Sequence, residues 1–191
     1  HQSTYNNLFI EGLSLTAGIR LDYERNKMDY YSAVDSMKIG VQMGPMNVSL
    51  PVNTVMEGSL SQDVWQLLPK VSLRYQCTPS TFTYLSVAKG YKTGGYNVQM
   101  FGDLVQAQAK YDLMSQFAPD QADAPVDVKQ AASYKPEHSW NYEFGTRSEL
   151  IPDRLTAELT LFYMNIRDIQ LTTFAETGSG RMITNGGKAD S

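Results

Sequence analysis

The sequence predicts an all-β fold in which antiparallel strands run up and down beside one another. Three observations support this prediction. Apolar and polar residues alternate strictly in several stretches, these stretches are unusually long, and short connections between them alternate with long ones. In an extended strand, such alternation places hydrocarbon on one face and polar groups on the other.

The first long stretch covers residues 13–24, LSLTAGIRLDYE. Every second residue from Leu13 to Tyr23 is apolar or aromatic, and the residues between them are polar, charged or glycine. Strands of soluble proteins usually run about 5–6 residues, whereas a tilted strand that crosses a membrane needs about 9–11. The length therefore favours a transmembrane β-barrel over a half-buried sandwich strand.

Shorter segments flank this stretch. Residues 4–10 are typical of the end of a preceding strand, and Glu11-Gly12 of a tight turn. After the stretch the alternation loosens. We expect residues 36–42 and 47–53 to pair as a hairpin around Gly44-Pro45, because glycine supplies turn geometry and proline fixes φ.

Alternation returns in residues 64–77. Pro69 cannot donate to a sheet ladder, so we expect it at a strand start, an edge or a bulge. A turn at residues 78–80 leads into a strand over residues 81–89, which continues into GYKTGGYN at residues 90–97.

A long irregular region, residues 98–135, follows. Its one helical pattern has the spacing i, i+3, i+7, i+10, which predicts a short amphipathic helix with a buried face made of Leu104, Ala107, Tyr111 and Met114. Residues 119–128 are rich in Pro, Ala, Asp and Gln, which predicts an exposed loop.

The last third of the chain alternates again. Strands are predicted over residues 140–147 and 155–171, with a tight connection at residues 151–154, and residues 181–191 resemble the start of another strand. The short connections are residues 11–12, 78–80 and 151–154, and the long ones are residues 26–63, 98–136 and 172–181. All long connections therefore lie at one end of the sheet, as in an up-and-down membrane barrel with tight periplasmic turns and long extracellular loops.

Composition narrows the function classes. The net charge of −4 and the pI near 5.1 give no indication of a nucleic-acid partner. Cys77 is the single cysteine and can form no internal disulfide. The nine methionines are scattered, without the spacing of metal ligands. His138 has no spacing that supports a catalytic set, so we expect it to be a rim residue at the mouth of a strand.

Five stretches carry a family resemblance: LSLTAGIRLDYE, LPKVSLRYQ, TYLSVAKGYKTGGYN, YKPEHSWNYEFGTRSEL and RLTAELTLFYMNIRDIQL. They occur in the order seen in TonB-dependent outer-membrane receptors, which this chain resembles. ITNGGKADS, residues 183–191, resembles the segment that opens the next strand of that family. The resemblance leaves the long loops unmatched, and loops are where such proteins hold their ligand specificity.

The resemblance implies a section from the second half of a barrel. Large transporters of this kind have about 22 strands around a plugged lumen, and roughly seven strands are expected here. Residues 1–191 are therefore expected to form a partial receptor barrel, without the plug domain, the TonB-binding segment and the remaining strands. We expect such a piece to associate through its open edges and apolar face or to belong to a larger assembly.

The implied function is energy-coupled uptake across the bacterial outer membrane of a large scarce ligand. A ferric siderophore is the first candidate, with haem, cobalamin or glycans as alternatives. The implied partners are outer-membrane lipid, the TonB complex and the ligand; no enzymatic activity, catalytic residue, metal site or cofactor is expected. The alternative from another class is a soluble extracellular β-sandwich that binds glycan or protein.

Three sets of site residues follow from these predictions. Charged residues expected on the polar, lumen-facing side of a barrel, where they can hold a plug, are Arg20, Lys70, Arg74, Glu143, Arg147 and Glu158. Apolar residues expected to face lipid are Leu15, Ile19, Leu73, Leu159 and Leu161. Rim or loop candidates for ligand binding are Tyr91, Lys92, Tyr96 and Asn97. For Tyr91 an aromatic-belt position is favoured, and for Tyr96 belt and ligand vestibule remain equal alternatives.

Overall fold

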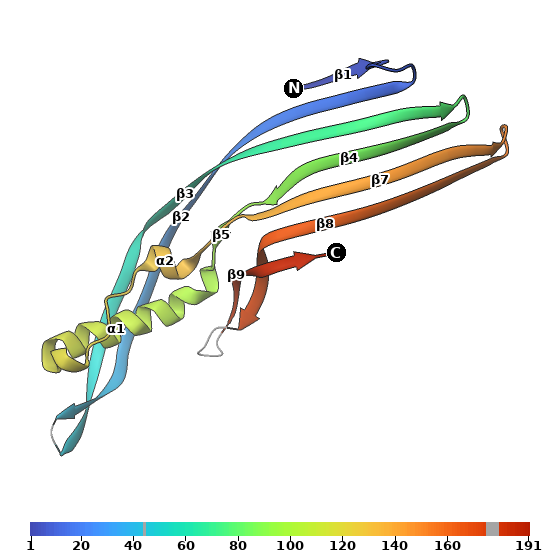
Figure 1. The fold of residues 1–191 in the computed structure, drawn as a ribbon. Helices are drawn as coiled ribbons and strands as arrows, with labels where there is room; N and C mark the ends of the chain where they lie inside the picture. The colour runs from blue at the N-terminus through green and yellow to red at the C-terminus, as the bar shows by residue number, and fades with distance from the viewer. Residues whose placement is uncertain (44, 175–179) are drawn as a thin grey trace.

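The computed structural model describes residues 1–43, 45–174 and 180–191. Seven strands form one antiparallel sheet in which every strand lies beside its neighbour in sequence (Figure 1). In sheet order they are β1 (Gln2–Asn6), β2 (Leu13–Met43), β3 (Met46–Thr78), β4 (Thr81–Lys92), β7 (Glu137–Ile151), β8 (Leu155–Phe174) and β9 (Arg181–Asp190). The predicted up-and-down antiparallel order is confirmed, and the sheet is open rather than closed.

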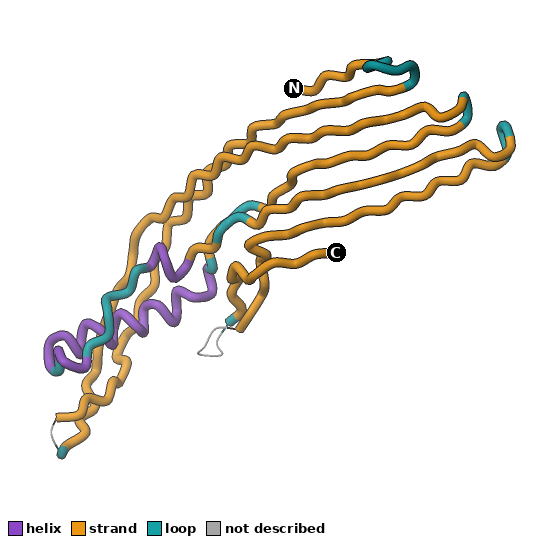
Figure 2. The backbone as a smooth tube through the Cα atoms, in the orientation of Figure 1, coloured by secondary structure: helices purple, strands orange, loops and turns teal. Residues whose placement is uncertain are grey.

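The β1–β2, β3–β4 and β7–β8 connections gather at one end of the sheet, and the long β4–β7 connection lies toward the other, with the tip of the β2/β3 pair (Figure 2). Pro79-Ser80 joins β3 to β4, and residues 152–154 join β7 to β8, as predicted. The connection between β1 and β2 is longer than predicted, because β1 ends at Asn6 and residues 7–12 form the link. Asn7 has a φ of 56° there, which ends the extended backbone, and its Oδ1 accepts from the Gly12 N–H at 3.0 Å.

β2 and β3 are far longer than the alternation predicted. They pair continuously from Leu13↔Tyr75 to Met43↔Met46 apart from one bulge, so the long loop predicted over residues 26–63 is wrong. The predicted hairpin of residues 36–42 with 47–53 is confirmed, as the tip of this same pair. Its turn residue Gly44 lies outside the described residues.

The bulge lies in β2, where Val34↔Thr54 is followed by Met37↔Val52. β2 therefore carries one extra residue, which leaves the next residues displaced by one position relative to β3. Ser36 adopts a φ of 54°, and its N–H donates to Asn53 Oδ1 at 2.7 Å. From here on the odd-numbered residues of β2 point to the side that the even-numbered ones occupied before.

The remaining elements lie between β4 and β7. They are β5 (Gly95–Tyr96), η1 (Val98–Met100), α1 (Phe101–Phe117), η2 (Pro119–Gln121), α2 (Val128–Ala132) and β6 (Ser133–Tyr134). None of the helices in the described part of the chain is long and apolar enough to cross a membrane. The predicted helix is confirmed in place. Its predicted buried face is confirmed for Leu104 and Met114 and wrong for Ala107, which is exposed, while Tyr111 is partly buried. The other buried residues of the helix are Phe101, Val105, Ala109 and Leu113.

The cross-strand register separates an apolar face from a polar face. Leu73 lies opposite Leu15 and Leu85, and the same row continues across the sheet through Phe144 and Leu161. Arg74, one position along, lies in the neighbouring row on the other face, with Ser14, Tyr84, Gly145 and Thr160. The apolar row is largely exposed, with Leu161 at 58%.

Candidate functional site

The polar face near the short turns holds its charged groups in defined contacts. The Tyr84 hydroxyl donates to Glu143 Oε1 at 2.5 Å, across the β4/β7 pair. The Arg74 guanidinium lies 4.0 Å from the centre of the Phe82 ring, and Arg147 lies opposite Glu158 in the β7/β8 register. These contacts orient the charges within the face before any other domain meets them.

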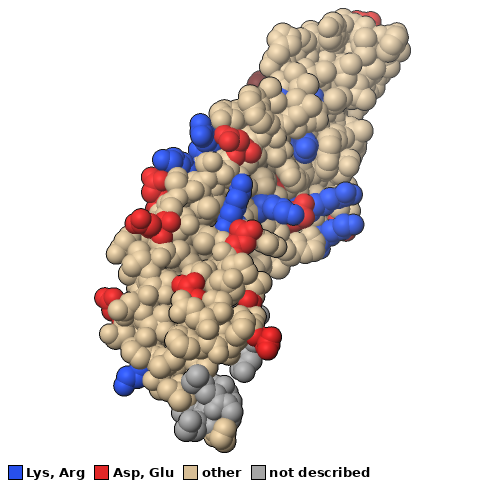
Figure 3. Space-filling view, turned by 90° about the vertical axis from the view of Figure 1, so that its left-hand side faces the viewer, with Lys and Arg blue, Asp and Glu red and all other residues tan. Residues whose placement is uncertain are grey.

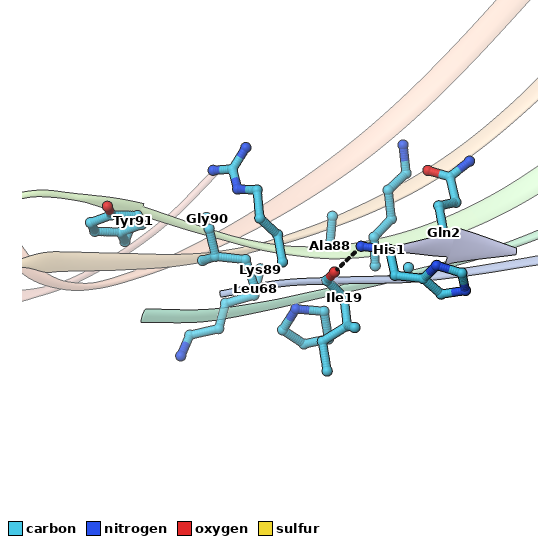
Figure 4. A pocket seen from close by; sticks show the side chains of 12 residues that line it. His1, Gln2, Ile19, Leu68, Ala88, Lys89, Gly90 and Tyr91 are labelled. Carbon is cyan, nitrogen blue, oxygen red and sulfur yellow. Dashed lines mark hydrogen bonds between the residues drawn. The ribbon is translucent and has the colours of Figure 1, made fainter. Parts of the chain in front are cut away.

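Further along the same face, small residues leave a hollow of about 480 Å³ (Figure 4). Gly18, Lys70 and Ala88 form one row across β2, β3 and β4, so two of the three positions carry little or no side chain. Arg20 and Lys70 line the hollow and give it a positive character. Arg20 also forms an ion pair of 2.9 Å with Asp22.

The two faces exchange character at the Tyr23↔Trp65 pair, whose ring centres are 4.5 Å apart. Up to this pair, β2 is apolar on the face that carries Tyr23. Beyond it, the same face carries charges: Lys27 and Asp29 form an ion pair at 3.4 Å. The hydroxyl of Ser59 first, and Lys27 second, lower the pKa of the Asp29 carboxyl. Figure 3 shows charged side chains gathered in a band midway along the molecule.

This exchange has the spacing that a membrane requires. From Leu13 to Tyr23 there are eleven residues, which matches the about 9–11 that a tilted strand needs to cross. Tyrosine and tryptophan are enriched where membrane meets water. β2 and β3 therefore continue into the aqueous phase as a hairpin whose outer side is charged. Because the apolar residues change face at Tyr23, the alternation of apolar and polar residues seen in residues 13–24 does not continue beyond residue 24.

Residues 93–135, here called the insert, fold over the side of this hairpin that lies opposite its charged outer side. Near the start of the insert, the Gly94 carbonyl accepts from Asn26 Nδ2 of β2 at 3.2 Å. A Cβ on Gly94 would lie 2.4 Å from the Tyr134 carbonyl oxygen, so the two ends of the insert approach each other closely here. Two apolar clusters then join α1 to the hairpin. The first contains Met56, Leu60, Phe101, Leu104, Val105 and Ala132. The second contains Ile39, Val41, Ala109, Leu113 and Met114.

The clusters explain the bulge in β2. Met28, Tyr30 and Val34, before the bulge, contact the first cluster, whereas Ile39 and Val41, after it, belong to the second. The extra residue thus keeps apolar side chains under the whole length of α1 as the hairpin twists. The protein core lies here, between helix and hairpin, rather than in the seven-stranded section.

The four ligand candidates have different surroundings. Tyr91 lies opposite His138 in the β4/β7 register, at the end of both strands where the long loops begin. Lys92, the next residue, is exposed and has no hydrogen-bond or ion-pair partner among the described residues. His138 therefore has the strand-mouth position predicted for it.

Tyr96 and Asn97 lie inside the insert. Tyr96 packs against the first apolar cluster, and its hydroxyl is buried without a partner in the described part of the chain. Burial first, and the charge of Asp63 second, raise the pKa of Tyr96. Asn97 is 7% exposed, and both polar atoms of its amide bond to the backbone of Ile183.

Several amide side chains were missed by the sequence reading. Gln170 donates from Nε2 to the Thr93 carbonyl at 2.6 Å, and Asn185 bonds to both backbone groups of Lys135. The available signal for Asn185 was its position directly before Gly186-Gly187. No group of three His, Cys, Asp or Glu side chains suited to a metal ion occurs within residues 1–43, 45–174 and 180–191.

A family model, TonB dependent receptor-like, beta-barrel, matches residues 5–191. The chain belongs to the TonB-dependent receptor family. It is therefore part of an outer-membrane protein, and its sheet is a section of a transmembrane barrel with long extracellular loops. The alternative of a soluble β-sandwich is wrong.

Curated relatives agree with this membership. The chain is 27% identical over 179 residues to the pesticin receptor of Yersinia pestis, a match that covers 91% of this chain and 19% of that protein. It is 25% identical over 177 residues to the pesticin receptor of Yersinia enterocolitica, with the same coverage. The chain thus spans about a fifth of the length of the curated relatives it matches.

Two solved structures share the fold. The ferric yersiniabactin uptake receptor FyuA from Yersinia pestis matches with a TM-score of 0.58 and 23% identity, over 99% of this chain and 21% of that one. The Serratia marcescens hemophore receptor HasR, solved with its hemophore HasA and heme, matches with a TM-score of 0.52 and 13% identity, over 93% of this chain and 28% of that one.

Proposed function

We propose that this chain is part of a receptor for energy-coupled uptake of a large scarce ligand, with a ferric siderophore as the first candidate. The observation that carries the proposal is the insert, a loop that packs through two apolar clusters on the inner side of the β2/β3 hairpin, at the extracellular end of the barrel wall. The name of one relative, a ferric yersiniabactin uptake receptor, supports a siderophore; the description of HasR, solved with its hemophore and heme, supports haem as the second ligand. Energy would reach the barrel through a TonB contact made by a region outside this chain.

In this proposal the apolar face meets lipid and the polar face lines the lumen. An Arg or Lys facing lipid near the middle of a membrane barrel costs about 2–4 kcal/mol, so the charged face points inward. The positive hollow beside Arg20 and Lys70, and the oriented groups of Arg74 and Glu143, are suited to charge-assisted hydrogen bonds with a plug domain. Arg147 and Glu158 belong to the same surface.

Among the four candidates, Lys92 is the residue that we expect to contact the ligand at the extracellular mouth. Its ammonium group has no partner within residues 1–43, 45–174 and 180–191. Lys92 lies where the barrel strands give way to the loops, opposite Glu137 in the β4/β7 register on the polar side. Tyr91 and Tyr96 lie within one to four residues of it and can shape the same region with their rings. Asn97 contributes through the fold, because both ends of its amide are already bonded.

The test uses the full-length receptor in a strain that lacks its other iron receptors. Growth under iron limitation on ferric yersiniabactin or on haem, with and without TonB, identifies the ligand class and the energy source. Lys92→Ala should weaken binding of the active ligand, measured on purified receptor, at least fivefold. Lys38→Ala, an exposed lysine at the hairpin tip, is the matched control. Growth on neither compound, or growth without TonB, would refute the proposed uptake.

A further inference from the structure

The insert is tied to β9 by side-chain amides at three alternate residues of that strand. The Arg181 N–H donates to Gln99 Oε1 at 2.8 Å. Two positions further along β9, Asn97 bonds to Ile183, and two positions beyond that, Asn185 bonds to Lys135. The spacing of two residues is that of the backbone groups along one edge of a strand.

Two of these ties are reciprocal. Asn97 accepts from the Ile183 N–H at 2.7 Å and donates to the Ile183 carbonyl at 2.9 Å. Asn185 accepts from the Lys135 N–H at 2.7 Å and donates to the Lys135 carbonyl at 2.9 Å. Each amide thus satisfies both backbone groups of one residue, as a neighbouring strand would. The first tie holds the beginning of the insert and the second holds its end.

Gln170 on β8 completes the attachment. Its Nε2 donates to the carbonyls of Thr93 and Lys135, at 2.6 and 3.2 Å, and its N–H donates to Glu137 Oε2 at 2.7 Å. Both ends of the insert are therefore bonded to β8 as well as to β9. The three stretches involved, TGGYN, YKPE and ITNGG, are far apart in the sequence and meet at this one place.

Burial makes the Asn97 tie hard to replace by water. Asn97 is 7% exposed. Its side-chain amide needs both a donor and an acceptor when it is buried, and the Ile183 N–H and carbonyl supply them. Removing the amide would leave the N–H and carbonyl of Ile183 without partners. Leaving these two groups unpaired costs more free energy than the net contribution of the two hydrogen bonds. The Asn97 tie therefore holds the beginning of the insert more firmly than exposed loop contacts do, and the Asn185 tie adds a second, exposed attachment at its end.

We propose that Asn97 and Asn185 are positioning residues that lock the insert and the β8/β9 hairpin into one rigid unit. The unit fixes the wall of the extracellular mouth before a ligand arrives, so that binding does not have to bear the entropic cost of ordering the loop. The effect on ligand binding rests on the proposed function; the locking itself does not. Neither asparagine needs to touch the ligand.

The experiment compares Asn97→Ala, Asn185→Ala and Asn97→Asp in the full-length receptor in detergent. Gln106→Ala is the matched control, since this exposed amide on α1 donates to the Gly102 carbonyl of its own helix and has no other partner in the described part of the chain. Hydrogen exchange in residues 98–132 and 181–186 should rise at least tenfold in both alanine variants and less in Asn97→Asp, which keeps the acceptor for the Ile183 N–H. Exchange in residues 13–23 and 155–165, and heat-modifiable migration of the barrel, should stay as in the parent.

Binding is measured with ferric yersiniabactin and with haem as probes. For the probe that the parent receptor binds, the alanine variants should raise the Kd at least tenfold without changing the amount bound at saturation. Unchanged exchange in residues 98–132 in both alanine variants would overturn the locking. If the parent binds neither probe, the proposed ligand class fails while the exchange result still decides the locking. If exchange rises and the Kd does not, the link between locking and binding is wrong.

Discussion

Tyr84 lies directly opposite Gly145 in the β4/β7 pair, and its ring fills the space that a side chain at residue 145 would need. A Cβ built on Gly145 would lie 2.3 Å from Tyr84 Cε1. The same relationship occurs between Tyr30 and Gly58 and between Tyr134 and Gly95, each pair facing across two strands. A tyrosine that covers a glycine protects the backbone where the sheet bends and compensates for the missing side chain.

Gly145→Ala should destabilise the full-length receptor by about 1–3 kcal/mol, because the Tyr84 ring must move and its hydrogen bond to Glu143 is lost. Chemical denaturation in detergent measures the free energy of unfolding. Gly187→Ala is the control, since a Cβ there meets no atom within 4 Å. Equal effects of the two substitutions would show that the ring does not occupy this position.

A pair of substitutions tests which face meets lipid. Leu159→Arg should hinder assembly of the parent barrel, since an arginine facing lipid near the midplane costs about 2–4 kcal/mol. Thr160→Arg, on the other face, should be tolerated. Heat-modifiable migration in outer-membrane fractions reports folded barrel for both. Similar behaviour of the two variants, or the reverse order, would contradict the assignment of the faces.

The topology can be tested with thiol chemistry. Cys77 is exposed next to the short turn that joins β3 to β4, which belongs to the periplasmic end. In intact cells a membrane-impermeant maleimide should not label it, and permeabilised cells should show labelling. A receptor with Cys77→Ser and Lys27→Cys should be labelled in intact cells, because Lys27 lies beyond the Tyr23↔Trp65 boundary. Any other cysteine of the full-length receptor is replaced first.

Tyr96 should make docking of the insert sensitive to alkaline pH. Its pKa is raised in the folded state by burial first, so the neutral form is favoured there. Its contribution is complete below the ordinary pKa of tyrosine, about 10, and is lost as the pH rises through the higher folded value. Limited proteolysis of residues 98–132 against pH should show a transition that Tyr96→Phe removes.

The same variant separates packing from ligand contact. Since the Tyr96 hydroxyl lacks a partner among the described residues, its removal should leave the insert as protected as in the parent, or more so, at neutral pH. A loss of protection at neutral pH would contradict this environment. If ligand affinity falls while protection is kept, the hydroxyl contacts the ligand, which is the vestibule alternative for this residue.

The membrane-spanning part of the fold could be predicted because lipid enforces one pattern there. Leu13 to Tyr23 alternate without exception, and the neighbouring strands repeat this, so strand order and faces followed directly. Beyond Tyr23 the apolar residues change sides, and a bulge at Ser36 shifts them once more. Periodicity over a short window shows neither event, and so a continuous strand was interpreted as a loop.

The site was harder to predict for a different reason. Asn97 and Asn185 were visible in the sequence, but an amide beside glycines has the same appearance whether it binds a ligand or a distant backbone. Only the fold shows that Ile183 and Lys135 are the partners. The buried face of α1 was misjudged because the twisted hairpin beneath it, not the helix alone, determines which residues are covered.

The bulge in β2 absorbs one residue without changing which side chains face α1. If one residue were deleted at Asp35 or Ser36, β2 and β3 would pair one to one and Met37 would still lie opposite Val52, so Ile39 and Val41 would still face α1. Deleting Lys38 would instead turn Ile39 and Val41 toward water and expose the lower end of α1. Among natural variants of this loop, single-residue length changes in β2 should therefore gather between Val34 and Met37, whereas those between Met37 and Val41 should be selected against.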